Sequence, residues 1–484
     1  MSDTNLPALF GNLQNIDAGG CPGPFIGESL WPYNGGFKEG RNCAPNPLVF
    51  TGNASRCCIP CPVFDWTYAD DFKSLTNGAA WVNVAGFILC GFILISHAVL
   101  PATATRRSWL NIILLLGIMI LELGFIVPLA RQPDQCFDPI TPNGQSSDLT
   151  CAFSGAFIAF GLMTYVTWIL VRSLFMHIQI CWNITLGAQS YWAANIGAWS
   201  TIIALTTATL AHAGVSFRFG GYCHVNVGSL ATYWGWLLGF GGVALLLQIA
   251  TFAYCIKVYL SSALQQRRDP SIKSPSVTSS SRSRTARATA RRVKQVVLLQ
   301  WRSFAIVILA IFTAAFVCVI FIVFDNKYTI QAFANTDSLI PWIVCVIGTQ
   351  DKNQCLQYTG PIIIKESLAV ATLFILGFVG VEAFFLLCRF EVFTAWWALL
   401  RTPFWKKKAR RANGSNENIL MSPNQNTTFS ESAQRDRSLV ESPIRAKTGE
   451  KAFGKHVEPG SPVSPIANDL DYEKDSRYGA GHAV

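Results

Sequence analysis

The sequence predicts an all-α membrane protein built as a bundle of seven transmembrane helices. Of its 484 residues 51% are apolar and only 14% are charged, which is too hydrophobic for a soluble multidomain protein. The apolar residues gather in blocks long enough for a helix, rising about 1.5 Å per residue, to cross roughly 30 Å of hydrocarbon. A strongly basic stretch between two such blocks then predicts which way the bundle faces.

That stretch runs from Lys257 to Arg302 and carries eleven Lys/Arg against one acidic residue, Asp269. Because short loops rich in Lys and Arg stay in the cytoplasm, we predict that the N-terminus lies outside and the C-terminus inside. The net charge of +10 comes from residues beside the apolar blocks, where they meet anionic membrane lipids. We therefore expect lipid rather than nucleic acid as the partner of this charge.

Residues 1–77 are predicted to form an extracellular cysteine-containing tail. The tail is slightly acidic and contains the glycosylation sequon that begins at Asn53, and both features suit an outside location. Residues 1–20 lack a basic n-region and a continuous apolar h-region, so the first helix is expected to act as its own targeting signal.

Residues 78–388 are predicted to hold the seven helices. These span about 78–100, 109–130, 151–180, 195–213, 230–260, 301–324 and 366–388, with the cytoplasmic basic loop at 261–300. Arg106 and Arg107, after the first helix, mark the inner side.

The chain after the seventh helix divides into two parts. Residues 389–408 mix aromatic and basic side chains and are predicted to form an amphipathic juxtamembrane helix on the inner leaflet. Residues 409–484 are polar, contain little apolar surface to bury and are predicted to be a disordered cytoplasmic tail.

The fifteen cysteines divide into two groups under this topology. Ten lie at the outer face: Cys21, Cys43, Cys57, Cys58, Cys61, Cys136, Cys151, Cys223, Cys345 and Cys355. This even number would allow five disulfides in an oxidising compartment. A Cys151–Cys223 bridge would tie the second outer loop across the bundle mouth, whereas pairing within the tail stays open. Zinc at Cys57, Cys58 and Cys61 is a weaker alternative, since no His lies nearby.

Ionisable residues inside the spans are the candidate functional residues. A charge at bilayer depth costs several kcal/mol, so such residues usually face the bundle and find partners. Glu122 and His212 are candidates for a polar ligand pocket. Glu382 is a candidate for an inner latch with Arg172 or Arg302. The alternatives are static packing pairs, or side chains near helix ends that reach the interface.

Several short motifs follow one another along the predicted helices: Gly161 with Trp168, Tyr191-Trp192 through Ala198-Trp199, Gly221-Tyr222-Cys223-His224-Val225, and Leu299-Gln300-Trp301-Arg302-Ser303-Phe304. In this order they resemble motifs of the Frizzled/Smoothened family of G-protein-coupled receptors. The last one resembles the base of the family's sixth helix, where a basic residue belongs to the activation switch. The resemblance thus implies such a role for Arg302.

The chain also departs from that family. The 77-residue tail is too short for the Wnt-binding cysteine-rich domain, as in the Frizzled-like receptors of fungi. The Lys-Thr-x-x-x-Trp motif that follows the family's seventh helix is absent, which argues against a Dishevelled-type partner. No Asp/Glu-Arg-Tyr triplet ends the third helix, which disfavours a rhodopsin-type receptor.

Together these observations predict a multi-pass plasma-membrane receptor that passes an unknown extracellular signal to a cytoplasmic partner, with a heterotrimeric G protein as the candidate. No P-loop, His-Glu-x-x-His or Gly-x-Ser-x-Gly motif is present, so we expect no enzyme, cofactor or metal. A transporter or channel for a small solute is the alternative, disfavoured because the two halves show no internal repeat. An adaptor without a diffusible ligand is a third reading.

Overall fold

The computed structural model describes residues 16–45, 56–105, 108–226, 228–268, 304–323, 336–360 and 363–401. The chain divides into two units, Met1–Pro403 and Phe404–Val484, and every described residue belongs to the first. Asn53, Arg302, most of the basic loop 261–300 and the tail 409–484 lie outside the described residues.

Seven helices in the described ranges are long and apolar enough to cross a membrane, so the predicted fold class is confirmed. They are α3 (Phe72–Val99), α5 (Trp109–Arg131), α6 (Leu149–Cys181), α7 (Ala188–His212), a fifth span Leu230–Val258, a sixth helix Phe304–Val323, and α12 (Glu366–Leu387). The fifth span begins as the π-helical turn η3 (Leu230–Trp234) and continues as α8 (Gly235–Arg268), past the expected end at residue 260. Helices suit these segments because every interior backbone N–H and C=O finds its partner within the helix.

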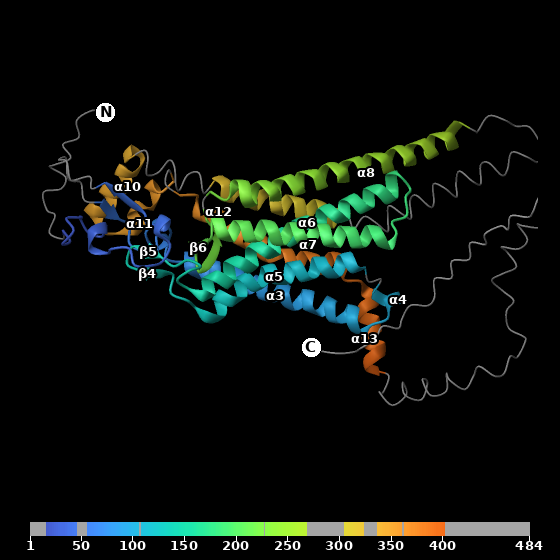
Figure 1. Ribbon diagram of the computed structural model, residues 1–484, viewed down its shortest axis with the longest axis horizontal. Coiled ribbons are helices and arrows are strands. Elements are labelled where there is room, and N and C mark those ends of the chain that lie inside the picture. Colours follow the sequence, from blue (N-terminus) through green and yellow to red (C-terminus); the bar gives the residue numbers. More distant parts are fainter. Residues whose placement is uncertain are drawn as a thin grey trace, which may run out of the picture. The chain divides into compact units, whose positions relative to one another are not determined.

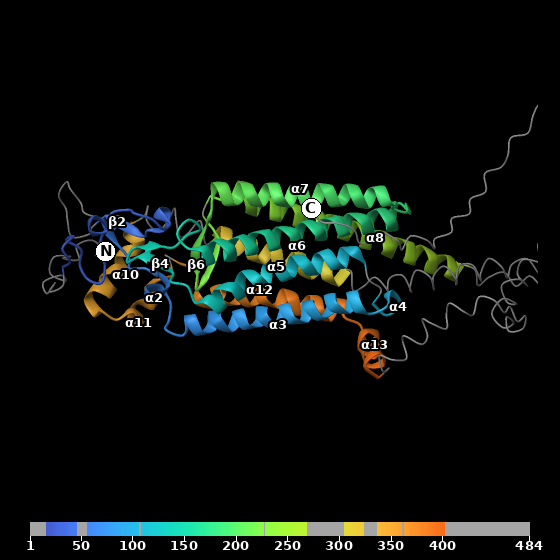
Figure 2. The same cartoon turned by 60° about the horizontal axis from the view of Figure 1, so that its bottom comes forward.

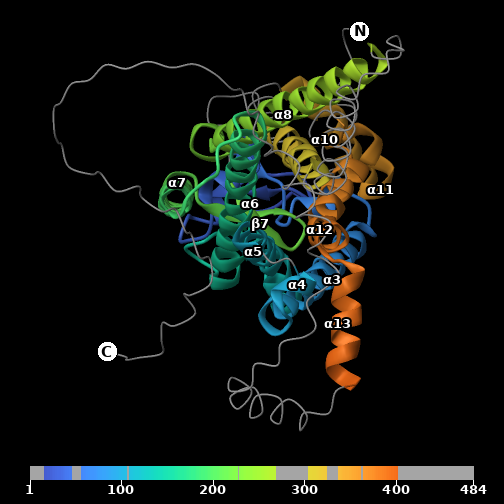
Figure 3. The same cartoon turned by 90° about the vertical axis from the view of Figure 1, so that its right-hand side faces the viewer.

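The helix α6 is central to the bundle. It packs against α5, α7 and α8, which lie around it when the bundle is viewed along its length (Figure 3). Its first turn is capped by Asp148, whose carboxylate accepts a hydrogen bond from the N–H of Cys151 at 2.6 Å. On the far side of α5, α3 packs against both α5 and α12 (Figure 2).

Small residues bring α5 and α6 close together. Gly161 of α6 lies against the backbone of Leu121, and Gly124 of α5 lies against Ile158. The hydroxyl of Ser154 donates a hydrogen bond to the carbonyl of Gly124 at 2.7 Å. In lipid, helices associate through this kind of close van der Waals packing, because the hydrophobic effect gives little drive between them.

One end of the bundle carries a small cap and two β-hairpins (Figure 1). The cap sheet is antiparallel in the order β1-β3-β2, with β1 (Ile26–Gly27), β2 (Cys43–Pro45) and β3 (Arg56–Cys58). The short helices η1 (Glu28–Leu30), η2 (Lys38–Gly40) and α2 (Phe64–Thr67) complete the cap. The hairpins are β4 (Cys136–Asp138) with β5 (Thr141–Pro142), and β6 (Val215–Phe219) with β7 (Tyr222–Val225).

The cap has a hydrophobic core of its own, separate from that of the bundle. The core includes α10 (Thr336–Thr349), a helix between the sixth and seventh spans where no helix was predicted. Trp342 of α10 is 1% exposed and meets Phe25 of the cap edge to face, with ring centroids 5.9 Å apart. The chain then continues through α11 (Lys352–Cys355) and η5 (Leu356–Tyr358) to α12.

Five disulfides join the ten cysteines assigned to the outer face. The pairs are Cys21–Cys57, Cys43–Cys58, Cys61–Cys136, Cys151–Cys223 and Cys345–Cys355. The first two hold the cap sheet, the third ties the cap to the β4–β5 hairpin, and the fourth ties β7 to α6. Because Cys57, Cys58 and Cys61 are all oxidised, none of them has a thiolate to offer to zinc.

At the opposite end, α13 (Phe390–Arg401) follows α12 and lies near the short helix α4 (Ala102–Thr105) (Figure 1). The indole N–H of Trp396 donates a hydrogen bond to the hydroxyl of Ser96 on α3 at 2.9 Å. The side chains of Phe390 and Leu400 are 86% and 75% exposed. Trp396 thus anchors one face of α13 to α3, whereas Phe390 and Leu400 lie exposed.

Candidate functional site

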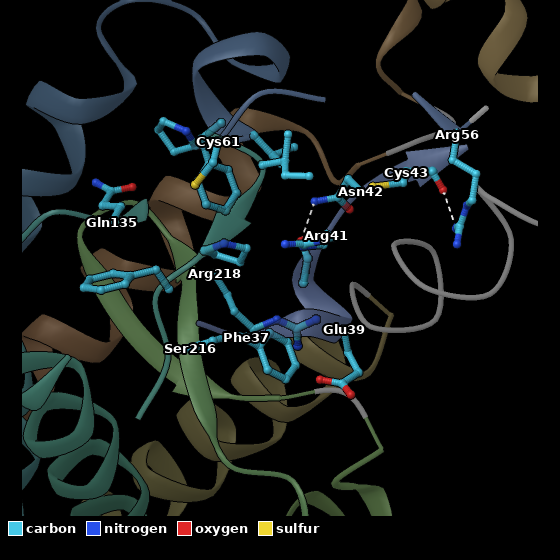
Figure 4. Close-up of a pocket in the computed structure, with 17 residues that line it drawn as sticks. Phe37, Glu39, Arg41, Asn42, Cys43, Arg56, Cys61, Gln135, Ser216 and Arg218 are labelled. Atoms are coloured by element: carbon cyan, nitrogen blue, oxygen red, sulfur yellow. Dashed lines mark hydrogen bonds between the residues drawn. The ribbon is translucent and has the colours of Figure 1, made fainter. Parts of the chain in front are cut away.

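A cavity of about 210 Å³ lies where the cap meets the two hairpins (Figure 4). The cap lines it with residues from Phe37 to Cys43 and from Arg56 to Phe64. The hairpins line it with Gln135, Ile140 and Pro142 on one side and with Ser216, Phe217 and Arg218 on the other. At roughly 30 Å³ per water molecule, the space would hold about seven waters, or one small ligand.

The cavity wall combines aromatic rings with guanidinium groups. Arg41 is held by neighbours on two sides: its Nη2 lies 3.3 Å from Asp138, and its Nε donates to the hydroxyl of Thr141 at 2.7 Å. Glu28 lies between Arg41 and Arg56, at 3.9 Å and 3.6 Å from their nitrogens. The Arg41–Asp138 pair joins the cap to the β4–β5 hairpin, whereas Glu28 joins Arg41 and Arg56 within the cap.

The β6–β7 hairpin forms the floor between this cavity and the helices. Its base is closed by a 2.5 Å hydrogen bond from the hydroxyl of Ser216 to the side-chain oxygen of Asn226. Gly220 has a φ of +61° at the hairpin turn, a conformation that favours glycine, and an added Cβ would press on Thr76. The disulfide Cys151–Cys223 then fixes the second strand to the start of α6.

The inner side of the same hairpin enters the helix bundle. Tyr222 donates a hydrogen bond from its hydroxyl to the carbonyl of Thr76 in α3 at 3.0 Å. The ring of His224 lies 5.0 Å from that of Phe321 in the sixth helix, and Phe321 stacks on Trp234 of η3 at 4.9 Å. One strand of the hairpin therefore lines the cavity, and the other contacts α3 and the sixth helix.

Burial of His224 makes the site sensitive to acid. The side chain is 2% exposed, and burial, followed by the positive charge of Arg218, lowers the pKa of His224 from 6.5 to about 3. Below about pH 6.5 the unfolded chain binds a proton at this position that the folded protein does not bind until about pH 3. The contribution of neutral His224 to the free energy of unfolding is therefore fully present above about pH 6.5. It is lost as the pH falls toward 3, by roughly 3 kcal/mol at about pH 4.

We expect the variant His224→Gln to lose less stability than the parent when the pH falls from about 7 to about 4. Melting temperatures in detergent, followed by tryptophan fluorescence at each pH, measure this difference. Other acid-sensitive groups are common to both proteins and cancel in the comparison. An equal drop in melting temperature for the two proteins would contradict the assignment.

The structure places the two predicted pocket residues in different parts of the molecule. Glu122 is 0% exposed and lies in the interior of the bundle, where its carboxylate is enclosed by Gly86 of α3 and Gly380 of α12. His212 ends α7 and lines an open cavity of about 390 Å³ at the cap end of the bundle, together with Tyr33 of the cap.

The structure likewise gives different neighbours to Arg172 and Glu382, two of the predicted switch residues. Arg172 donates a hydrogen bond from Nη1 to the side-chain oxygen of Asn111 in α5 at 2.6 Å. Glu382 lines a small void of about 10 Å³ that also borders Tyr165. Arg302 lies outside the described residues, so its partner in the latch stays a prediction.

Sequence reasoning missed the residues that line the cap cavity. Arg41 and Arg218 lie far apart in the sequence, and nothing in their local pattern separates them from other loop arginines. The one usable signal was the Gly221–Val225 motif, which covers β7 and includes His224. The sequence located this element without indicating that its partner strand would form the floor of a cavity.

Comparison with known proteins gives one strong sequence match. No protein-family model matches the chain. The chain is 38% identical over 384 residues to the G protein-coupled receptor gprM of Aspergillus fumigatus, and the match covers 78% of this chain and 76% of that protein. Among solved structures, the crystal structure of squid rhodopsin aligns with 80% of this chain and 97% of its own, at 10% identity and a TM-score of 0.40.

Proposed function

The chain belongs to the G protein-coupled receptor family, a receptor rather than an enzyme, and we propose that it senses a ligand in the cap cavity and signals to a heterotrimeric G protein. In this proposal the protein lies in the plasma membrane, with the cap outside. The ligand binds between the cap and the β6–β7 hairpin, and the G protein binds at the end of the bundle near α4 and α13.

The continuity of the hairpin is the observation that carries this proposal. Arg218 and Ser216 on β6 line the cavity, whereas Tyr222 and His224 on β7 touch α3 and the sixth helix. A ligand that moves β6 must therefore move the ring against Phe321, because the two strands share a hydrogen-bonded register. The disulfide Cys151–Cys223 makes α6 the fixed point of that movement.

A ligand changes the balance between two receptor states only through a difference in its affinity for them. Each tenfold difference in affinity is worth about 1.4 kcal/mol. A cavity with walls from the cap and from the hairpin can supply such a difference, since its shape depends on how the hairpin lies against the cap. A pocket lined by one rigid element would bind both states equally.

We further propose that the receptor is of the Frizzled/Smoothened type without the Wnt-binding domain. In support, residues of the family-like motifs meet in the fold: Trp168 lies edge to face with Trp199 at 5.9 Å, and Gly161 permits the close approach of α5. Arg172, Arg302 and Glu382 remain our candidates for the inner switch. Glu122, inside the bundle, and His212, at the end of α7, remain our candidates for polar ligand-pocket residues.

The coupling can be tested by exchanging Phe321 for leucine, which keeps most of the buried volume but removes the ring that contacts His224 and Trp234. Nucleotide exchange on a purified heterotrimeric G protein is measured in vesicles that contain the full chain. We expect Phe321→Leu to change the basal exchange rate by about fivefold, equivalent to a shift of about 1 kcal/mol between the two receptor states.

Phe312→Leu is the matched control, because Phe312 lies on the same helix and is 64% exposed. It is expected to leave the exchange rate unchanged. Equal rates for vesicles with and without receptor would contradict coupling to that G protein. Solute flux through receptor-containing vesicles, with no effect on exchange, would instead favour a transporter.

A further inference from the structure

The open cavity that His212 lines, about 390 Å³ in volume, lies where the cap meets the end of α7. We call it the α7 groove. The cap lines it with Tyr33 and residues 36–39, and the loop before α6 lines it with residues 144–146. Residues 211–215 and Asn226 complete the lining. Because α7 is a membrane span that ends at His212, the groove lies at the level where hydrocarbon gives way to lipid headgroups.

The lining of the α7 groove carries charges of both signs. Lys38 and Glu39 are neighbours in η2, and both side chains are exposed. The ammonium nitrogen of Lys38 lies 5.6 Å from the centroid of the Tyr33 ring, a contact that favours this position for the cation. Tyr33 is itself held by a hydrogen bond from its hydroxyl to the carbonyl of Gly36 at 3.2 Å. With the exposed imidazole of His212, an ammonium and a carboxylate therefore border one space.

The end of α7 is prepared for a polar ligand. The last carbonyls of a helix carry partial negative charge and repel an anion. Here the side-chain amide of Gln145 donates to the carbonyl of Leu210 at 3.0 Å, and that of Asn226 donates to the carbonyl of Ala213 at 2.9 Å. These two carbonyls are thus already engaged, which reduces their repulsion of an anion in the groove.

The lipid-facing side of α7 next to the groove is shallow. Ala204, Thr207 and Ala211 are exposed there, and their spacing of four and three residues places them on one face of the helix. The neighbouring helix α6 begins at the same end of the bundle, where Leu149 and Phe153 are 73% and 49% exposed. Small side chains on one helix beside large ones on the next leave a track that an acyl chain can fill.

We propose that the α7 groove binds the zwitterionic headgroup of a membrane phospholipid, whose acyl chains lie against α7. Lys38 and His212 contact the phosphate group, and Glu39 contacts the ammonium group. This ligand class accounts for both signs of charge in the lining and for the position of the groove at the end of a span. A headgroup with a phosphate but no ammonium would instead bring a second negative charge toward Glu39.

The volume of the groove is in the range of small-ligand pockets, about 300–1,000 Å³. Phe37 and Glu39 also line the cap cavity, so a headgroup that restrains Glu39 restrains one wall of that cavity as well. The proposal does not depend on a ligand in the cap cavity or on coupling to a G protein. It is tested by lipid binding alone, so the two proposals can succeed or fail separately.

The test is native mass spectrometry of the purified full chain in detergent, titrated with phosphatidylcholine or with phosphatidylglycerol, which has the phosphate but no ammonium. We expect one saturable phosphatidylcholine per chain, bound more tightly than phosphatidylglycerol. Lys38→Gln and His212→Gln should each weaken the binding of both lipids about tenfold, the loss of one charge-assisted hydrogen bond. Glu39→Gln should weaken the binding of phosphatidylcholine only, which removes the preference between the two lipids.

Lys73→Gln is the matched control, because Lys73 is an exposed lysine in the first turn of α3 at the cap end and does not line the groove. It should bind both lipids as the parent does, and melting temperatures establish that every variant is folded. Equal affinities of Lys38→Gln and Lys73→Gln for phosphatidylcholine would overturn the proposal. An equal effect of Glu39→Gln on both lipids would also overturn it.

A last arm separates a membrane lipid from a soluble source of the same headgroup. Glycerophosphocholine carries the phosphate and the ammonium but no acyl chains. At a concentration equal to that of the lipid, we expect it to displace no phosphatidylcholine, because it lacks the apolar contact with α7. Displacement at equal concentration would overturn the assignment to a membrane lipid.

Discussion

Replacing Gly161 with alanine is expected to destabilise the folded receptor by about 3 kcal/mol, near the upper end of the range for overpacking a core. A Cβ at this position would overlap the backbone nitrogen and Cα of Leu121 in α5. Backbone atoms cannot rotate away as a flexible side chain can, so α5 and α6 would have to separate. Their separation would also disturb the hydrogen bond from Ser154 to the carbonyl of Gly124.

The measurement is thermal melting of purified protein in detergent, with the yield of correctly folded receptor as a second readout. Gly197→Ala is the matched control, because Gly197 is also inside a transmembrane helix but has nothing within 4 Å of an added Cβ. The control should melt at or slightly above the parent temperature, since alanine favours helix over glycine by about 1 kcal/mol. Similar melting temperatures for Gly161→Ala and Gly197→Ala would show that α5 and α6 do not depend on this close contact.

Removing the disulfide Cys151–Cys223 by the double substitution to serine is the second change with a large expected effect. The bond closes a loop with a sequence separation of 72 residues, and the loss of that constraint on the unfolded chain corresponds to about 4 kcal/mol. Both cysteines are 0% exposed, so the serine hydroxyls would in addition be buried. We expect little folded receptor, measured by the yield of purified protein and by melting of what remains.

The control is the same double substitution at Cys345 and Cys355. This bond spans only 10 residues, and the same argument assigns it about 3 kcal/mol. It lies in the cap, away from the hairpin that reaches the sixth helix. The seven-helix bundle should therefore survive its loss. A lower yield of folded receptor for the control than for the Cys151/Cys223 variant would contradict this order.

Much of the fold follows from local sequence. The seven long apolar helices were predicted because lipid leaves a chain few ways to satisfy its backbone polar groups, so hydrophobic length is a direct signal. The helix α10 was missed for the complementary reason. It is short, contains Pro341, and depends on Phe25 and the cap sheet to bury Trp342. A segment stabilised mainly by distant partners has a weak local signal.

The candidate site was less accessible to prediction. The sequence favoured ionisable residues inside the spans, and this criterion selected Glu122 and His212. The cavity instead lies outside the spans, and the residues that build it come from segments far apart in the sequence. Arg41, for example, contacts Asp138 across 97 residues. Similarly, Tyr222 of the hairpin meets Thr76 across 146 residues. No periodicity or spacing along the chain encodes such pairs.

The sequence by itself determined that this protein is a seven-helix membrane protein, because membrane insertion depends on the apolar length and flanking charge of each segment. The tertiary structure alone decided which cysteines pair, that the cap has its own core, and that one hairpin joins a cavity to the sixth helix. These features depend on packing between distant segments, where the position of each side chain is set by its neighbours in space.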